Sequence, residues 1–281
     1  MSLALLLPLL AQVGMGSALP QAPLPDPRKK DAPAVTQSAA PAQPTMLQQC
    51  LQLAMERPSD AIEVADGWLA KAKTQAERAG AKQCKALALT RIEGWDQAAV
   101  LFLSARDELP ASERGERGRL GSLGGNAWIV AGDVDQGLAA LDQAHGDAAA
   151  AGDGKLDALI QIDRARALVA LGRQDEAAQA LAEARRLVPD NAQGWLLSAT
   201  LSRRMGKLAE AQQQIQRAAD LFPIDPEIGL EAGVIAVLSG RDEAARLSWL
   251  SVIKTAPASP AAKTAQAYLD QLGPPAAQPG R

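Results

Sequence analysis

The stretch GRQDEAAQALAEARRLVPDN, which runs from Gly172 to Asn191, occurs three times in outline along the chain. It returns as GKLAEAQQQIQRAADLFPID from Gly206 and as GRDEAARLSWLSVIKTAPAS from Gly240. Successive glycines of this set are 34 residues apart. A fixed period of this length is typical of stacked helical hairpins. The sequence therefore predicts an all-α array built from one repeated helix–turn–helix unit.

Three positions of the outline have a physical reason to recur. The glycine ends the first helix of the unit, where the backbone turns left-handed and other residues are strained. The alanine five residues later lies early in the second helix, where the first helix comes too close for a larger side chain. The proline, seventeen residues after the glycine, stops the second helix. These residues are Ala177, Ala211 and Ala245, and Pro189, Pro223 and Pro257.

The intervals resemble those of the tetratricopeptide repeat family. Three contiguous units carry the resemblance, the first over 158–191, the second around Trp195 and Gly206, and the third over 226–259. The third departs from the family pattern at Val252, where a small residue is usual. The resemblance implies a right-handed superhelical solenoid of about six helical hairpins, in which the first helix of each hairpin lines a concave groove that holds peptides or protein segments.

The repeats upstream follow the same pattern more loosely. Glu93 stands where one unit would have its turn glycine, and Gly137 takes the alanine position of the next. After that unit, the stretch HGDAAAAGDGK from His145 is expected to be a long loop. The segment after Pro260 is expected to be a single capping helix. The repeat domain is thus assigned to residues 46–273, about four-fifths of the chain.

The two ends differ in composition from the repeats. Residues 1–18 have an apolar core that ends in small residues, as a cleaved secretion signal does, although no basic residue precedes that core. An uncleaved anchor is the alternative, but spanning a bilayer takes roughly 20 apolar residues. Residues 19–45 are rich in proline and alanine and predict a disordered linker, and 274–281 predict a disordered tail. We therefore expect a periplasmic or secreted bacterial protein whose mature chain has no transmembrane segment.

Charge and motifs argue against several functions. The net charge of −3 gives no basic footprint for nucleic acid. His145 is the only histidine, with no cluster of metal ligands around it, and is expected at the surface near a helix end. The glycines around Ser122 lack the spacing of a nucleophile elbow, and Gly124 and Gly125 are better explained by close helix packing. The chain is therefore expected to be non-enzymatic and to need no cofactor.

Two cysteines, Cys50 and Cys84, are one repeat period apart. Each falls in the first helix of its hairpin, and such helices run side by side, so the thiols could face each other. In an exported protein such a pair predicts a disulfide. The alternative is two free cysteines packed as small apolar residues.

The resemblance also implies which residues line the groove. A carboxylate clamp known in this family is absent, because Asn126 matches one of its positions while Ser122, Asp163, Gln193 and Leu197 occupy the others. What remains is an apolar strip with a few basic and polar side chains, suited to an amphipathic protein segment. For the aliphatic members, ordinary packing between repeats is the alternative. A self-associating scaffold or assembly factor of the envelope is the second functional hypothesis. The expected lining is Arg119, Ser122, Asn126, Leu159, Ile162, Arg166, Val169, Leu196, Thr200, Arg203, Leu230 and Val234.

Overall fold

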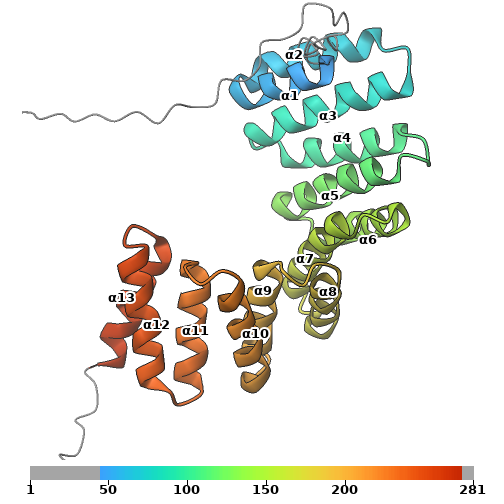
Figure 1. The fold of residues 1–281 in the computed structure, drawn as a ribbon. Coiled ribbons are helices and arrows are strands. Elements are labelled where there is room, and N and C mark those ends of the chain that lie inside the picture. The colour runs from blue at the N-terminus through green and yellow to red at the C-terminus, as the bar shows by residue number, and fades with distance from the viewer. Residues whose placement is uncertain (1–44, 274–281) are drawn as a thin grey trace, which may run out of the picture. The chain divides into compact units, whose positions relative to one another are not determined.

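The computed structural model describes residues 45–273, which form thirteen α-helices and no β-strand (Figure 1). The expected signal peptide, linker and tail lie outside the described residues, except for Thr45. In chain order the helices are α1 (Met46–Glu56), α2 (Pro58–Lys71), α3 (Gln75–Arg91), α4 (Trp95–Glu108), α5 (Arg114–Ala131), α6 (Val134–Ala151), α7 (Gly154–Ala170), α8 (Gln174–Leu187), α9 (Ala192–Arg204), α10 (Leu208–Leu221), α11 (Pro226–Leu238), α12 (Asp242–Thr255) and α13 (Pro260–Leu272).

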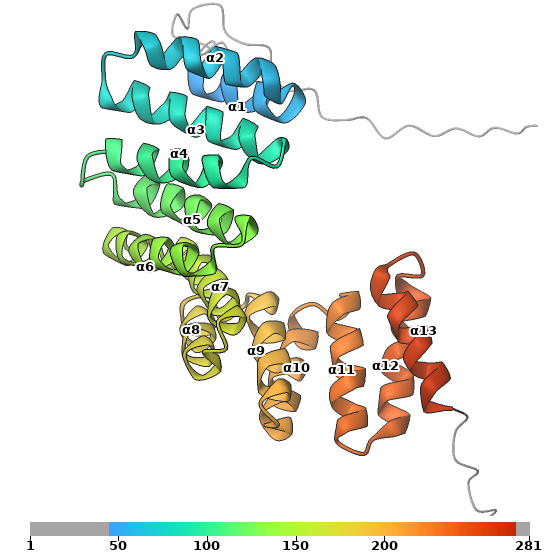
Figure 2. The same cartoon turned by 180° about the vertical axis from the view of Figure 1, so that it is seen from behind.

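Helices that follow one another in sequence pack against each other along the whole array (Figures 1 and 2). The first helices of neighbouring hairpins also touch, at α1–α3, α5–α7 and α9–α11. The last helix, α13, packs on both α12 and α11. The predicted all-α solenoid of six hairpins and a capping helix is therefore confirmed for the described residues.

The turn of each C-terminal hairpin is made by the repeated glycine. Gly172, Gly206 and Gly240 have φ values of 74°, 76° and 70°, in the left-handed region. The N–H of the residue after each glycine donates to a carbonyl five residues back, as from Arg173 to Leu168 at 2.8 Å. This bond closes the last turn of the first helix and satisfies a carbonyl that would otherwise lack a partner.

One hairpin makes the same turn without glycine. Glu93, between α3 and α4, has a φ of 62°, and the N–H of Gly94 donates to Leu89 at 2.9 Å. Glutamate therefore adopts the left-handed conformation that the repeat requires, at a cost of roughly 1 kcal/mol. The deviation in sequence does not change the local structure.

The repeated alanines and prolines act as predicted. Ala177, Ala211 and Ala245 have no exposed surface. The second helices α8, α10 and α12 each end two residues before the repeated proline. The residue before that proline is forced out of helical geometry, as at Phe222 with φ −143° and ψ 79°.

The predicted long loop after His145 is wrong. Helix α6 continues to Ala151, and only Gly152 and Asp153 separate it from α7. Alanine is the strongest helix former, so the alanine run propagates the helix. The extension is also packed, because Ala148 is fully buried against α5. Gly152, with φ 71°, then ends the helix.

Close packing explains Gly124 and Gly125 of α5, as predicted. A Cβ on Gly125 would lie 2.8 Å from the Leu141 side chain and 2.9 Å from the carbonyl oxygen of Gly137 in α6. A backbone oxygen cannot move aside as the end of a side chain can. Helices α5 and α6 therefore approach each other more closely than side chains at these positions would allow.

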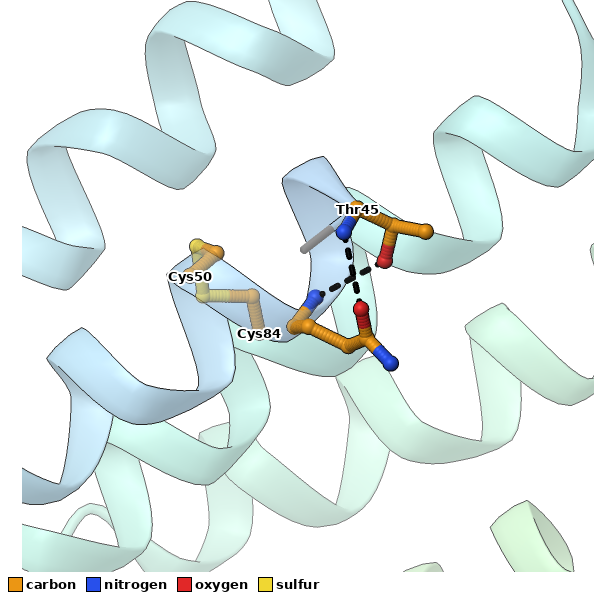
Figure 3. Close-up of a disulfide and its surroundings, with 4 residues drawn as sticks. Thr45, Cys50 and Cys84 are labelled. Carbon is orange, nitrogen blue, oxygen red and sulfur yellow. Dashed lines mark hydrogen bonds between the residues drawn. A yellow bond between two sulfur atoms is a disulfide. The ribbon is translucent and has the colours of Figure 1, made fainter. Parts of the chain in front are cut away.

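Cys50 and Cys84 form a disulfide that joins α1 to α3, with a Cα–Cα distance of 5.9 Å (Figure 3). Both sulfurs are buried among small side chains of the first two hairpins. Helix α1 begins with a capping box, in which the Thr45 hydroxyl accepts from the N–H of Gln48 and the Gln48 side chain accepts from the N–H of Thr45. A bridge over this sequence separation contributes about 3–4 kcal/mol in the chain-entropy account.

Replacing Gly125 by alanine should destabilise the protein, because the new Cβ overlaps the backbone of α6. The expected loss is roughly 1–3 kcal/mol, seen as a lower Tm by circular dichroism. Gly146→Ala is the matched control, since Gly146 lies inside α6 with nothing within 4 Å of an added Cβ. It should raise the free energy of unfolding by up to about 1 kcal/mol, because alanine has the higher helix propensity, and the Tm should rise accordingly. Equal effects would contradict the packing role.

Protein isolated from its natural cell compartment should contain no free thiol, and a peptide map should show one link between Cys50 and Cys84. Reduction should lower the Tm, because the bridge holds α1 against α3. Two thiols titrating in native material would contradict both the bridge and the expected export.

Candidate functional site

The residues predicted to line a groove fall on the first helices of four successive hairpins. They are Arg119, Ser122 and Asn126 on α5, Leu159, Ile162, Arg166 and Val169 on α7, Leu196, Thr200 and Arg203 on α9, and Leu230 and Val234 on α11. The structure brings some of them together and removes others from the surface.

A polar chain links α5 to α7. The side-chain amide of Asn126 donates to one oxygen of Asp163 at 2.7 Å, and Arg166 donates to the other oxygen at 2.7 Å. Asp163 is thereby held from both sides and is largely covered, while the Arg166 side chain keeps 47% of its surface exposed. Only one nitrogen of the Arg166 guanidinium is used, so its remaining donors face solvent.

A cavity of about 200 Å³, which we name the groove pocket, lies between α7 and α9 with α8 at its base. Its walls are aliphatic, and two arginines, Arg166 and Arg204, stand among the lining residues. Arg204 is exposed and forms no ion pair within residues 45–273. The pocket therefore combines an apolar interior with uncompensated positive charge. Its lining is Ala165, Arg166, Val169, Leu181, Leu197, Thr200, Leu201 and Arg204.

Arg203, which was predicted to face a partner, is instead part of the packing between hairpins. Its Nε donates to Glu231 of α11 at 2.6 Å and its Nη2 donates to the other carboxylate oxygen at 3.3 Å. The two side chains are only 20% and 13% exposed. Glu231 therefore neutralises the charge of Arg203, and Arg204, the next residue of α9, lines the groove pocket instead.

Three other predicted residues contribute little to a binding surface. Ile162 is buried, at 1% exposure, in the core formed by α7 and α8, so its assignment to the lining is wrong. Leu196 is half-buried against the core of α9 and α10. The Thr200 hydroxyl lines the groove pocket, but it donates to the carbonyl of Leu196 within its own helix.

On α5, two predicted residues lie outside the groove pocket. Arg119 forms an ion pair with Glu116 of its own helix, and Ser122 is partly exposed. Of the predicted residues, Arg166, Val169 and Thr200 line the groove pocket, and Asn126 is linked to Arg166 through Asp163. Leu197 and Arg204 line the groove pocket but were not predicted to do so. The sequence signal that points to them is that each directly follows a predicted lining residue.

His145 was predicted near a helix end, and this prediction is wrong. It lies within α6, and its Nδ1 is 2.6 Å from a carboxylate oxygen of the buried Asp157 in α7. The side-chain amide of Gln161 is 3.1 Å from the same nitrogen. The histidine therefore joins two hairpins, and its contacts are those of a structural residue.

Residues 45–273 contain no group of three or more histidine, cysteine or acidic side chains placed to hold a metal ion. Over the same range, no helix is both long and apolar enough to cross a membrane.

Comparison with known proteins agrees with this architecture. The family model described as tetratricopeptide repeat matches residues 158–201. No curated protein matches the chain by sequence. The solved structure of PilF from Pseudomonas aeruginosa has a TM-score of 0.60 at 14% identity, covering 79% of this chain and 97% of that one.

Two further structures are similar. BtubC from P. vanneervenii has a TM-score of 0.56 at 16% identity, covering 85% of this chain and 98% of that chain. YrrB, described as a TPR protein with an unusual peptide-binding site, has a TM-score of 0.52 at 16% identity and covers 73% of this chain and 99% of its own. Residues 158–201 therefore match the tetratricopeptide repeat by sequence, and the described residues have the fold of a tetratricopeptide-repeat solenoid.

Arg203 and Arg204 should differ sharply when each is replaced by alanine. Arg203→Ala leaves the covered Glu231 carboxylate without its partner and should cost roughly 1–3 kcal/mol of stability. Arg204→Ala should change stability by no more than about 0.5 kcal/mol, because the side chain is exposed and unpaired. Thermal unfolding measures both. A double-mutant cycle with Glu231→Ala should assign the loss to the ion pair, and additive single effects would contradict it.

Proposed function

We propose that the protein is a non-enzymatic interaction module that binds a segment of another protein along the first helices α5, α7 and α9. The observation that carries this proposal is the groove pocket, where aliphatic walls meet the exposed charges of Arg166 and Arg204. An apolar recess with a few placed polar groups is the usual form of a binding site. The similarity to YrrB, described as having a peptide-binding site, supports the same use of the fold.

We further propose that the module works in the bacterial cell envelope, in the periplasm or after secretion. The apolar segment with small residues at its end within residues 1–18 supports export. The disulfide supports it independently, because such bridges persist in oxidising compartments and are rare in the cytosol.

The alternative function, a self-associating scaffold, is favoured by one surface. Large apolar side chains are exposed around α12 and the turn before α11, and two of them line a recess of about 310 Å³ there. An apolar surface of this kind can mark a contact with another chain. The exposed residues are Phe222, Ile224, Leu247 and Leu250.

Reversing the two pocket charges tests the proposed groove. The variant Arg166→Glu, Arg204→Glu should keep its helicity and lose most of its captured partner in crosslinking from envelope extract, because the reversed charges no longer complement the bound segment. The matched control is Arg217→Glu, Lys254→Glu, which makes the same charge change on exposed, unpaired residues of the second helices. Arg185, another arginine on a second helix, is left unchanged in the control variant, because its guanidinium lies 4.7 Å from the Trp195 ring centre and burial lowers its pKa.

Capture lost equally by both variants, or by the control alone, would place the site elsewhere. The scaffold hypothesis gives a different result in the same samples. It expects sedimentation coefficients that rise with protein concentration and fall back when Leu247 is replaced by serine, with no dependence on the pocket arginines.

A further inference from the structure

A second cavity stands at the same place in the repeat as the groove pocket, two repeats later. We name it the cap pocket; it has a volume of about 350 Å³ and lies between α11, α12 and the capping helix α13. Adding two 34-residue periods to Arg166, Val169, Leu181, Thr200 and Arg204 gives residues that line the cap pocket. These counterparts are Val234, Val237, Trp249, Tyr268 and Leu272.

The two pockets differ in chemistry although they share a position. Where the groove pocket has Arg166 and Arg204, the cap pocket has Val234 and Leu272. The cap pocket is also lined by aromatic rings, with the Trp249 and Tyr268 centroids 5.3 Å apart. The indole N–H of Trp249 already donates to the carbonyl of Leu230, so the ring presents an apolar surface.

The position between the two pockets carries an ion pair. Arg203 stands one period after Val169 of the groove pocket and Glu231 one period after Leu197, and the two side chains are bonded to each other. A charged pair thus takes the place that two aliphatic side chains have one hairpin earlier. The first helices of the array therefore carry two separated recesses with an internally neutralised polar pair between them.

We propose that the two pockets bind one extended protein segment with two different anchors, which specifies the partner of the function proposed above. The anchor for the groove pocket is an aliphatic side chain next to a carboxylate, since its interior is aliphatic and Arg204 has no partner of its own. The anchor for the cap pocket is an aromatic side chain, which can stack on Trp249 and Tyr268 without bringing charge.

The spacing of the anchors follows from helix packing. Helices in direct contact have axes about 10 Å apart, and successive first helices lie at least that far from each other, so two repeat steps span about 20 Å or more. An extended chain covers about 3.3–3.6 Å per residue. The two anchors are therefore separated by at least about six residues. Leu238, the last residue of α11, is exposed and extends the apolar lining of the cap pocket.

Fluorescent synthetic peptides test this proposal against the full chain. The parent peptide carries Asp-Leu-Glu and a phenylalanine about six residues away, joined by serine and threonine, and is made in both orders. Binding is measured by fluorescence anisotropy. One order should bind, and affinity should fall about tenfold or more when the acidic residues become lysine or the phenylalanine becomes serine. Shortening the spacer by half should cost as much, because the anchors then cannot reach both pockets.

Charge exchange separates recognition from folding. The lysine peptide should bind Arg166→Glu, Arg204→Glu better than it binds the unmodified protein, which a variant that merely misfolded could not do. Leu272→Glu should remove the dependence on phenylalanine while leaving the dependence on the acidic residues. The control Arg217→Glu, Lys254→Glu should behave as the unmodified protein.

Two results would overturn the two-anchor proposal: no binding of either order, or binding indifferent to the anchors. If partner capture still depends on Arg166 and Arg204 in either case, the interaction module stands and only its partner chemistry is wrong. If capture is independent of them as well, both proposals fail.

Discussion

The contact on which this structure depends is the close crossing of the two helices in each hairpin, made possible by one small buried residue. Ala177, Ala211 and Ala245 have no exposed surface, and each lies where a larger side chain would separate the helices. Because the crossing is set within the hairpin, every hairpin presents its neighbour with the same apolar face, and stacking follows without a central core. At α5 and α6 glycine replaces alanine, and the backbones come closer still.

Periodicity in the sequence predicts this architecture because its reasons are local. A left-handed turn, a small residue and a helix-stopping proline act within one hairpin and do not depend on distant partners. The pairing of Cys50 with Cys84 was predicted for a related reason, since one repeat period places the two thiols on adjacent first helices. Even Glu93, which breaks the sequence rule, obeys the geometry that the neighbouring residues impose.

The groove was harder to predict, because side-chain direction at its surface depends on contacts between hairpins. Arg203 and Arg204 are neighbours on one helix, and sequence alone does not show that Glu231 of the next hairpin binds the first and leaves the second free. Ile162 is buried in the core that α7 forms with α8, a contact that its place on a first helix does not reveal. The cap pocket depends on Tyr268 and Leu272 of α13, a capping helix that has no second helix after it within the described residues.

Charged contacts hold helices together both within and between hairpins. Within one hairpin, Lys82 and Arg78 of α3 both donate to Glu108 of α4, and Lys82 in particular holds the pKa of that carboxyl below its usual range. Between hairpins, Arg106 of α4 reaches Asp147 of α6 at 2.7 Å. Such bonds add directional contacts to the apolar packing of the array.

The disulfide makes the two ends of the described array unequal in their resistance to unfolding. A stack in which each hairpin is held by its neighbours loses structure most easily from its ends, where a unit has one neighbour instead of two. At the N-terminal end the bond between Cys50 and Cys84 prevents α1 from leaving α3. At the other end α13 is held by packing alone. Heat or mechanical force is therefore expected to peel the solenoid from its C-terminal end, one hairpin after another, with the covalently joined pair as the last unit to open.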